Sequence, residues 1–142
     1  ESFSVYNGRG QLYTEMGEFS SSLADLDKAV ELGTEHETPT SLAYAYSGRA
    51  LAHAGLGNYA EADRDFERSV QLCAGNAWVQ YNQGLMYHKL GKEPEAAVCF
   101  ELALQLREPA LTPRKRARAQ EYQTRHQGAN LKGAQTRHSD SA

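Results

Sequence analysis

Side chains that could bind a metal or act as nucleophiles are sparse in this sequence. Its 2 cysteines and 5 histidines show none of the short paired spacings that zinc sites use. Cys73 and Cys99 are better interpreted as small buried side chains. No Gly-x-Ser-x-Gly elbow, phosphate-binding loop or dinucleotide fingerprint occurs. The sequence therefore predicts no metal site, no cofactor and no enzyme activity.

Acidic side chains come in pairs two residues apart, Asp25 with Asp27 and Asp63 with Asp65. On a helix this spacing points the two members in different directions, so they are poorly placed to act together as acid and base. We interpret both pairs as part of a solvated outer face. A substitution such as Asp65→Ala is accordingly expected to cost almost nothing in the free energy of partner binding.

Charge is distributed unevenly along the chain, whose formal net charge is -3. Residues 1–106 hold 15 acidic and 7 basic residues, whereas residues 107–142 hold 8 basic and 3 acidic ones. Four of the basic residues form a cluster, namely Arg114, Lys115, Arg116 and Arg118. We favour a solvated helix whose positive charges face the acidic body. Contact with nucleic acid or another anionic partner remains the alternative.

Three segments of the chain share one register. Each contains a glycine at the same point, and these glycines, Gly17, Gly57 and Gly91, are 40 and 34 residues apart. A small residue lies seven positions before each glycine, a ring lies four before it, and Leu or Phe lies nine after it. In chain order these are Gly10, Ala50 and Gly84, then Tyr13, His53 and Tyr87, then Leu26, Phe66 and Phe100. Glycine between stretches of helical period predicts two antiparallel helices in each segment.

This register resembles the tetratricopeptide repeat, a helical unit of about 34 residues with the same small, Tyr, Gly, Ala and Phe positions. Ser22 departs from it, because repeats of this kind have Ala there. The resemblance implies an all-α helical-repeat solenoid of three antiparallel helix pairs with a C-terminal capping helix. We assign repeats to residues 1–33, 42–75 and 76–109, an insertion and helix start to 34–41, a capping helix to 110–128, and a disordered tail to 129–142.

Two local signals refine these boundaries. Thr38-Pro39 combines an N-cap with a first-turn proline, so we expect the helix that follows to begin about one turn early. Thr112-Pro113 is the same combination and predicts another helix start. We interpret this helix as the cap that the last repeat needs over its apolar edge. We expect this cap to pack on the preceding helix through Leu111, Ala117 and Tyr122.

In tetratricopeptide repeat proteins the first helices of successive pairs line a concave groove that holds a peptide or a partner helix. The resemblance therefore implies a scaffold or adaptor that binds protein. By register, the candidate partner-binding residues are Asn7, Gln11, Thr14, Tyr44, Ser47, Leu51, Trp78, Tyr81, Asn82, Leu85 and His88. Any one of these aromatic or leucine side chains could equally belong to the core. Trp78 and Tyr81 look surplus to the core, and such residues are enriched in binding hot spots.

Members of the family that bind chaperones hold acidic C-terminal tails with Lys, Arg and Asn side chains on these first helices. The matching positions here are Asn7, Gln11, Gly48, Trp78 and Asn82. Since none is a cation, we expect no acidic-tail clamp. The expected partner is a protein or peptide of another kind, and self-association through the repeat edges is a further possibility.

Composition bounds where the chain works. No apolar run approaches the roughly 20 residues of a membrane span, so no membrane partner is expected. Two cysteines cannot form a disulfide framework, which points to a reducing, cytoplasmic compartment. Because the sequence begins at Glu1 rather than Met, we expect it to be part of a larger protein, with any targeting signals outside it.

Overall fold

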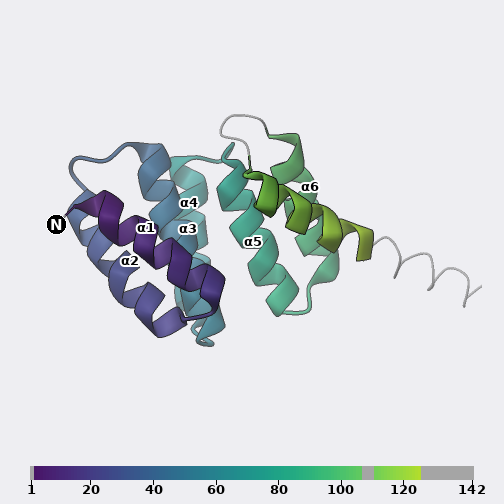
Figure 1. Ribbon diagram of the computed structural model, residues 1–142, viewed down its shortest axis with the longest axis horizontal. Helices are drawn as coiled ribbons and strands as arrows, with labels where there is room; N and C mark the ends of the chain where they lie inside the picture. Colours follow the sequence, from purple (N-terminus) through teal and green to yellow (C-terminus); the bar gives the residue numbers. More distant parts are fainter. Residues whose placement is uncertain (1, 107–110, 126–142) are drawn as a thin grey trace, which may run out of the picture.

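The computed structural model describes residues 2–106 and 111–125, and this part of the chain contains helices but no strand (Figure 1). The helices are α1 (Phe3–Met16), α2 (Phe19–Gly33), α3 (Pro39–Gly55), α4 (Tyr59–Leu72), α5 (Ala77–Lys89) and α6 (Glu93–Gln105). A further helix, here called the C-terminal helix, runs over residues 113–125. The expected all-α helical-repeat fold is confirmed. The predicted tail, 129–142, lies outside the described residues.

Glycine ends the first helix of each pair, as the register predicts. Gly17, Gly57 and Gly91 have φ angles of 78°, 83° and 74°. A side chain at such a φ would be strained, whereas glycine adopts it freely. The chain can therefore reverse direction within two or three residues and lay the second helix of each pair against the first.

Small residues allow the two helices of a pair to approach closely. A Cβ atom at Gly10 would lie 2.6 Å from Leu26 Cγ, and one at Gly84 would lie 2.8 Å from Phe100 Cε1. Both distances are shorter than a carbon–carbon contact of about 3.5 Å, so no larger residue fits without repacking. The pairing of a small residue with a large one, read from sequence spacing, is thus a contact in the folded protein.

Part of the insertion between the first two repeats, residues 39–41, forms the first turn of α3. α3 begins at Pro39, and the Thr38 side chain accepts a hydrogen bond from the Ser41 backbone N–H. This N-cap and first-turn proline confirm the early start predicted for this helix.

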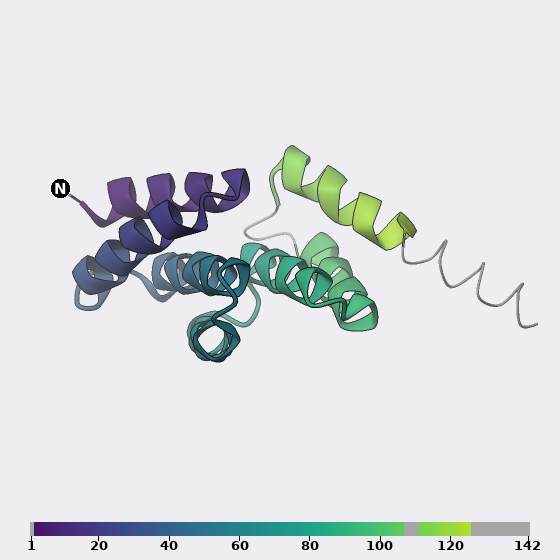
Figure 2. The same ribbon diagram turned by 90° about the horizontal axis from the view of Figure 1, so that it is seen from below.

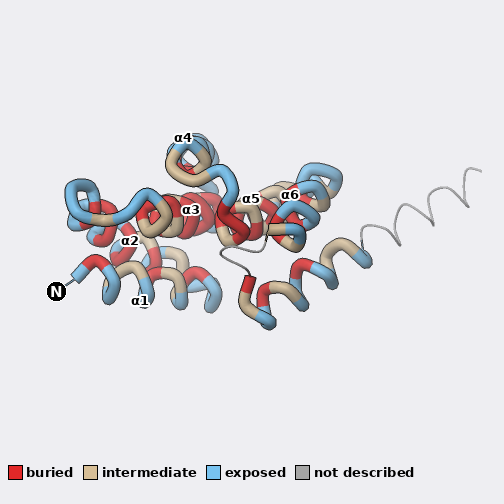
Figure 3. Tube along the Cα trace, turned by 90° about the horizontal axis from the view of Figure 1, so that it is seen from above, coloured by how far each residue is buried: buried red, intermediate tan, exposed pale blue. Residues whose placement is uncertain are grey.

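Two helices, α1 and the C-terminal helix, lie at the two ends of the row of helices and do not lie side by side (Figure 2). In Figure 2, α1 and the C-terminal helix are both on one side of α3 and α5, and a gap separates them. Figure 3 shows that buried residues concentrate in α3 and α5 between these ends. Residues of these four helices line one cavity, in which α3 and α5 form the floor and α1 and the C-terminal helix form the two walls (Figure 2).

The C-terminal helix completes the last apolar core, but not through all of the expected residues. Leu111 and Ala119 are buried in a cluster with Tyr81 of α5 and Phe100 of α6. The Tyr122 ring stacks on the Phe100 ring with centroids 4.8 Å apart. The expectation for Ala117 is wrong, because it is exposed. The inward face follows positions 115, 119 and 122, which are four and three residues apart, and residue 117 lies off that face.

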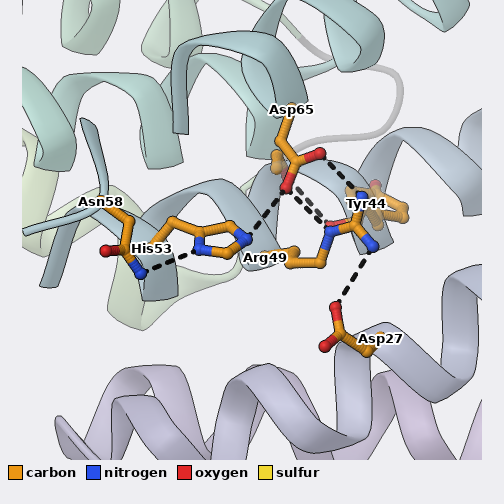
Figure 4. A network of polar contacts seen from close by, with 7 residues as sticks. Asp27, Tyr44, Arg49, His53, Asn58 and Asp65 are labelled. Atoms are coloured by element: carbon orange, nitrogen blue, oxygen red, sulfur yellow. Dashed lines mark hydrogen bonds and ion pairs between the residues drawn. The ribbon is translucent and has the colours of Figure 1, made fainter. Parts of the chain in front are cut away.

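The acidic pairs are only half solvated, which corrects the sequence-based interpretation. Asp25 and Asp65 are each 7% exposed, whereas Asp27 and Asp63 are exposed. Arg49 Nε and Nη2 each donate a hydrogen bond of 2.8 Å to the Asp65 carboxylate, and Figure 4 shows the guanidinium between Asp65 and Asp27. An arginine of the preceding helix thus draws one member of each pair inward. The spacing of each pair alone could not reveal that partner.

Candidate functional site

A cavity of about 600 Å³ lies between α1, α5 and the C-terminal helix. It gathers eight of the eleven candidate partner-binding residues. These are Gln11, Thr14, Leu51, Trp78, Tyr81, Asn82, Leu85 and His88. Asn7, Tyr44 and Ser47 are not among its lining residues. The structure therefore brings most of the set predicted from three separate helices to one place, which we call the concave cavity.

The end formed by repeat one is polar. Gln11 Nε2 donates hydrogen bonds to the Tyr44 backbone oxygen at 2.8 Å and to Asn7 Oδ1 at 3.2 Å. The Gln11 amide lies over Gly48, where a Cβ atom would be only 2.5 Å from it. Both contacts hold the Gln11 side chain in one orientation, with Asn7 and Tyr44 supporting it from outside the cavity.

Thr14 is buried, and its hydroxyl is engaged within repeat one. Its Oγ1 lies 3.0 Å from the Gly10 backbone oxygen and next to the Ser22 hydroxyl, and Ser22 Oγ lies 2.9 Å from the same Gly10 oxygen. Because each hydroxyl has one proton, one of them donates to the Gly10 oxygen and the other donates either to that oxygen or to the neighbouring hydroxyl. The replacement of the usual Ala by Ser22 is therefore matched by Thr14, and the two hydroxyls join α1 to α2.

Two other candidates connect repeats two and three beneath the cavity. Ser47 is fully buried, donates to the Tyr44 backbone oxygen at 3.0 Å, and accepts from Asn82 Nδ2 at 3.1 Å. Leu51 is 4% exposed and packs with Met86. These side chains build the floor and fix α5 against α3, which leaves little of their surface for a partner.

The aromatic end belongs to repeat three, and its two aromatic residues differ. Tyr81 is 4% exposed and meets Phe100 edge-to-face at 5.9 Å, so the expectation that it is surplus to the core is wrong. Burial raises the pKa of Tyr81 to about 12. Trp78 is only half-buried, with its ring against Tyr44 at 5.2 Å. Both residues line the cavity, and Trp78 is the more exposed of the two.

The C-terminal helix supplies lining residues that the register of the repeats did not include. They are Thr112, Arg114, Lys115, Arg118 and Tyr122, and they join Glu15 of α1 and Lys89 of α5. Lys115 Nζ lies 3.5 Å from the centroid of the Trp78 ring and 3.6 Å from Glu15 Oε1. Burial lowers the pKa of Lys115 to about 8, although the Glu15 carboxylate opposes this shift.

His88 lies where α5, α6 and the C-terminal helix meet. Its Nδ1 is 2.8 Å from Glu93 Oε1, and its ring is 4.5 Å from the Tyr122 ring centroid to centroid. Glu93 stands where repeats one and two have an aromatic residue, so this departure from the repeat pattern has a structural partner. Tyr122 touches both His88 and Phe100, and it thereby ties one wall of the cavity to the core.

The part of the chain that the structure describes contains no group of three His, Cys, Asp or Glu side chains able to hold a metal ion. None of its described helices is long and apolar enough to cross a membrane. The residues that line the concave cavity offer hydrogen-bonding groups, aromatic faces and charged side chains.

Comparison with protein families agrees with this architecture. Two family models described as tetratricopeptide repeat match the chain, one over residues 3–32 and one over residues 41–108. Together they span α1 to α6. A comparison with curated proteins gave no significant match.

Proposed function

Because the chain belongs to the tetratricopeptide repeat family, whose repeats generally mediate protein–protein interaction, we propose that it binds a peptide or partner helix in its concave cavity. It acts as a scaffold or adaptor module. The family is a non-catalytic class, so the proposal includes no reaction. The cavity volume of about 600 Å³ falls in the range of sites that enclose a ligand.

The half-buried Trp78 carries this proposal. Its indole and Leu85 line the cavity, and so does the polar side chain of Gln11. A partner is therefore expected to place an apolar or aromatic residue on Trp78. Its backbone is expected to hydrogen-bond near Gln11, since an amide side chain can both donate and accept.

Nucleic-acid binding by the basic cluster is supported less well. Only Arg114 and Arg118 of the cluster are exposed. Lys115 is buried against Glu15, and Arg116 donates to the Leu104 backbone oxygen at 3.4 Å. Arg114 and Arg118 line the cavity, so the basic cluster of the described C-terminal helix forms no continuous stripe that could follow a phosphate backbone.

Peptide display against the full chain tests the proposal. Selected peptides should lose about 2 kcal/mol or more of binding to a Trp78→Ala variant, the usual threshold of a hot spot. Val98→Ala is the matched control, because Val98 is an exposed residue of α6 that does not line the cavity. Circular dichroism of both variants checks the fold. Selected peptides that bind Trp78→Ala as tightly as the wild type would contradict the proposal.

A further inference from the structure

The concave cavity is cationic although the body of the protein is acidic. Four lining residues are Lys or Arg, and they come from α5 and the C-terminal helix. They are Lys89, Arg114, Lys115 and Arg118. Glu15 is the only carboxylate among the lining residues. Residues 1–106 as a whole carry 15 acidic and 7 basic residues, so the cavity inverts the charge of its surroundings.

The basic residues enter from a wall that the repeat register does not describe. The first helices of the three pairs carry no cation at Asn7, Gln11, Gly48, Trp78 and Asn82. The C-terminal helix instead places Arg114 and Arg118 four residues apart on one face. Its first turn also carries the positive end of the helix dipole, which adds to the preference for an anion.

Lys115 occupies the centre of this wall. Its side chain is 10% exposed, and its ammonium lies over the Trp78 ring and 3.6 Å from Glu15. A buried charge is costly unless it is paired. The Glu15 side chain is 36% exposed, so this carboxylate reaches Lys115 from the rim of the cavity. The pair therefore consists of a fixed cation and a carboxylate that solvent can reach.

We propose that the concave cavity binds an acidic peptide segment, whose side-chain carboxylates replace Glu15 at Lys115 and pair with Arg114 and Arg118. An apolar residue of the segment rests on Trp78. This inference rests on the proposed function and specifies the partner's chemistry. Glu15 is an internal stand-in for the partner, since it already places a carboxylate against the cation that the partner would use.

The charge arrangement predicts opposite effects for the two members of the ion pair. Glu15→Gln removes the competing carboxylate and leaves Lys115 in need of an anion, so an acidic peptide should bind more tightly. Lys115→Met keeps a long apolar side chain over Trp78 but removes the charge, so the same peptide should bind more weakly. A merely structural role of the pair would weaken binding in both variants.

Fluorescence anisotropy with two labelled peptides tests this. One is Gly-Glu-Glu-Phe-Leu-Glu-Glu-Gly, the other has Gln in place of every Glu, and both have blocked ends. We expect the acidic peptide to bind the wild type roughly tenfold more tightly, and Glu15→Gln to widen that difference by roughly threefold. Lys115→Met should remove most of it. Arg125→Gln is the control, because Arg125 is exposed on the same helix and pairs with Glu121 outside the cavity.

Each other result decides against the inference. Equal affinities of the two peptides, both lost in Trp78→Ala, would overturn it and leave the proposed function standing. Display selection that yields no peptide sensitive to Trp78→Ala would overturn both. Tighter binding of a short oligothymidine than of the acidic peptide, with a steep loss between about 50 and 200 mM salt, would replace it with nucleic-acid binding. If circular dichroism shows that Lys115→Met is unfolded, Glu15→Gln still tests the inference. The tighter peptide binding predicted for Glu15→Gln cannot result from loss of the fold.

Discussion

Repeats one and two join their helices in a different way from repeat three at the same structural position. In the first two repeats, the residue eight positions before the turn glycine is an arginine and the residue eight positions after it is an aspartate. These residues are Arg9 with Asp25 and Arg49 with Asp65, and each guanidinium donates two hydrogen bonds of 2.7 to 2.8 Å to its carboxylate. In repeat three the corresponding residues are Gln83 and Cys99, with Sγ and Oε1 3.9 Å apart. One fold position thus accepts either a two-pronged ion pair or a weak neutral contact.

The neutral pair in repeat three coincides with a larger apolar core. Phe100 meets Tyr81 at 5.9 Å and Tyr122 at 4.8 Å, and the cluster continues into the C-terminal helix. The ion pairs of repeats one and two fix the orientation of two helices through directed hydrogen bonds. Repeat three obtains the same orientation from ring packing and from the helix that covers it. The difference predicts which substitutions each repeat tolerates.

The largest effect is expected from breaking an ion pair in repeat two. Asp65→Ala leaves the Arg49 guanidinium with the exposed Asp27 as its remaining carboxylate partner, and breaking a pair as buried as Arg49–Asp65 costs about 4 kcal/mol. Urea unfolding followed by circular dichroism measures the change. Asp63→Ala is the control, since Asp63 is exposed on the same helix two residues away. Equal losses in the free energy of unfolding of the two variants would show that the Arg49–Asp65 ion pair is not what stabilises repeat two.

The next largest effect is a pH dependence of stability caused by Lys115, a buried residue of the C-terminal helix that covers repeat three. Its pKa falls from 10.5 to about 8 on folding, so the unfolded chain binds more protons between these values and the free energy of unfolding rises with pH there. Since one pKa unit corresponds to about 1.4 kcal/mol, the wild type should gain on the order of 3 kcal/mol relative to Lys115→Met between pH 7 and pH 10.5.

The comparison with Lys115→Met isolates this group. Burial raises the pKa of Cys99 to about 11 and that of Tyr81 to about 12, and both act in the opposite direction at high pH. Those two groups are present in the wild type and the variant, so their contribution cancels in the difference. A difference that stays constant with pH would mean that Lys115 is solvated in the folded protein.

A smaller loss is expected from the cap of repeat three. Tyr122→Ala removes a half-buried ring from Phe100 and should lower the free energy of unfolding by about 2 kcal/mol. Ala117→Ser is the control, because Ala117 is exposed on the same helix. Thermal or urea unfolding of both variants gives the comparison. A silent Tyr122→Ala would show that repeat three holds its core without the C-terminal helix.

The smallest effect belongs to the neutral pair itself. Cys99→Ala removes a sulfur atom from a buried site but leaves no charge unpaired, so we expect a loss of about 1 kcal/mol. The same measurement on Asp65→Ala, at the equivalent position of repeat two, should give a loss several times larger. The ratio of the two losses is therefore a direct measure of how differently the repeats are held together.

The sequence was sufficient for the fold because its signals are local and repeated. Gly17, Gly57 and Gly91 mark the turns, and the small residues opposite Leu26 and Phe100 fix how closely the helices approach. The start of α3 followed from Thr38-Pro39 alone. Each of these features depends on a few neighbouring residues, or on a spacing that recurs in every repeat.

The errors came from contacts that one helix cannot reveal. Asp65 lies inward because Arg49 faces it from sixteen residues away, and a search for arginine eight positions before the turn glycine would have found both ion pairs. The prediction named Ala117, whereas Ala119 is the residue that packs inward, because the sequence does not say which face of the C-terminal helix docks. The cationic wall was missed for the same reason, since Arg114 and Arg118 reach the cavity only once that helix is placed.

The contact between Glu15 and Lys115 gives the array a mechanical property. Helical repeats contact mainly their neighbours, so a solenoid stretches and twists like a spring whose turns yield one after another. Here a side chain of the first helix reaches one from the last described helix, 100 positions later in the chain. Lys89 of α5 adds a second contact of this kind, because its Nζ lies 4.9 Å from the centroid of the Phe19 ring of α2. A pulling force that separates the two ends therefore acts on these contacts between distant repeats as well as on the contacts between neighbouring helices.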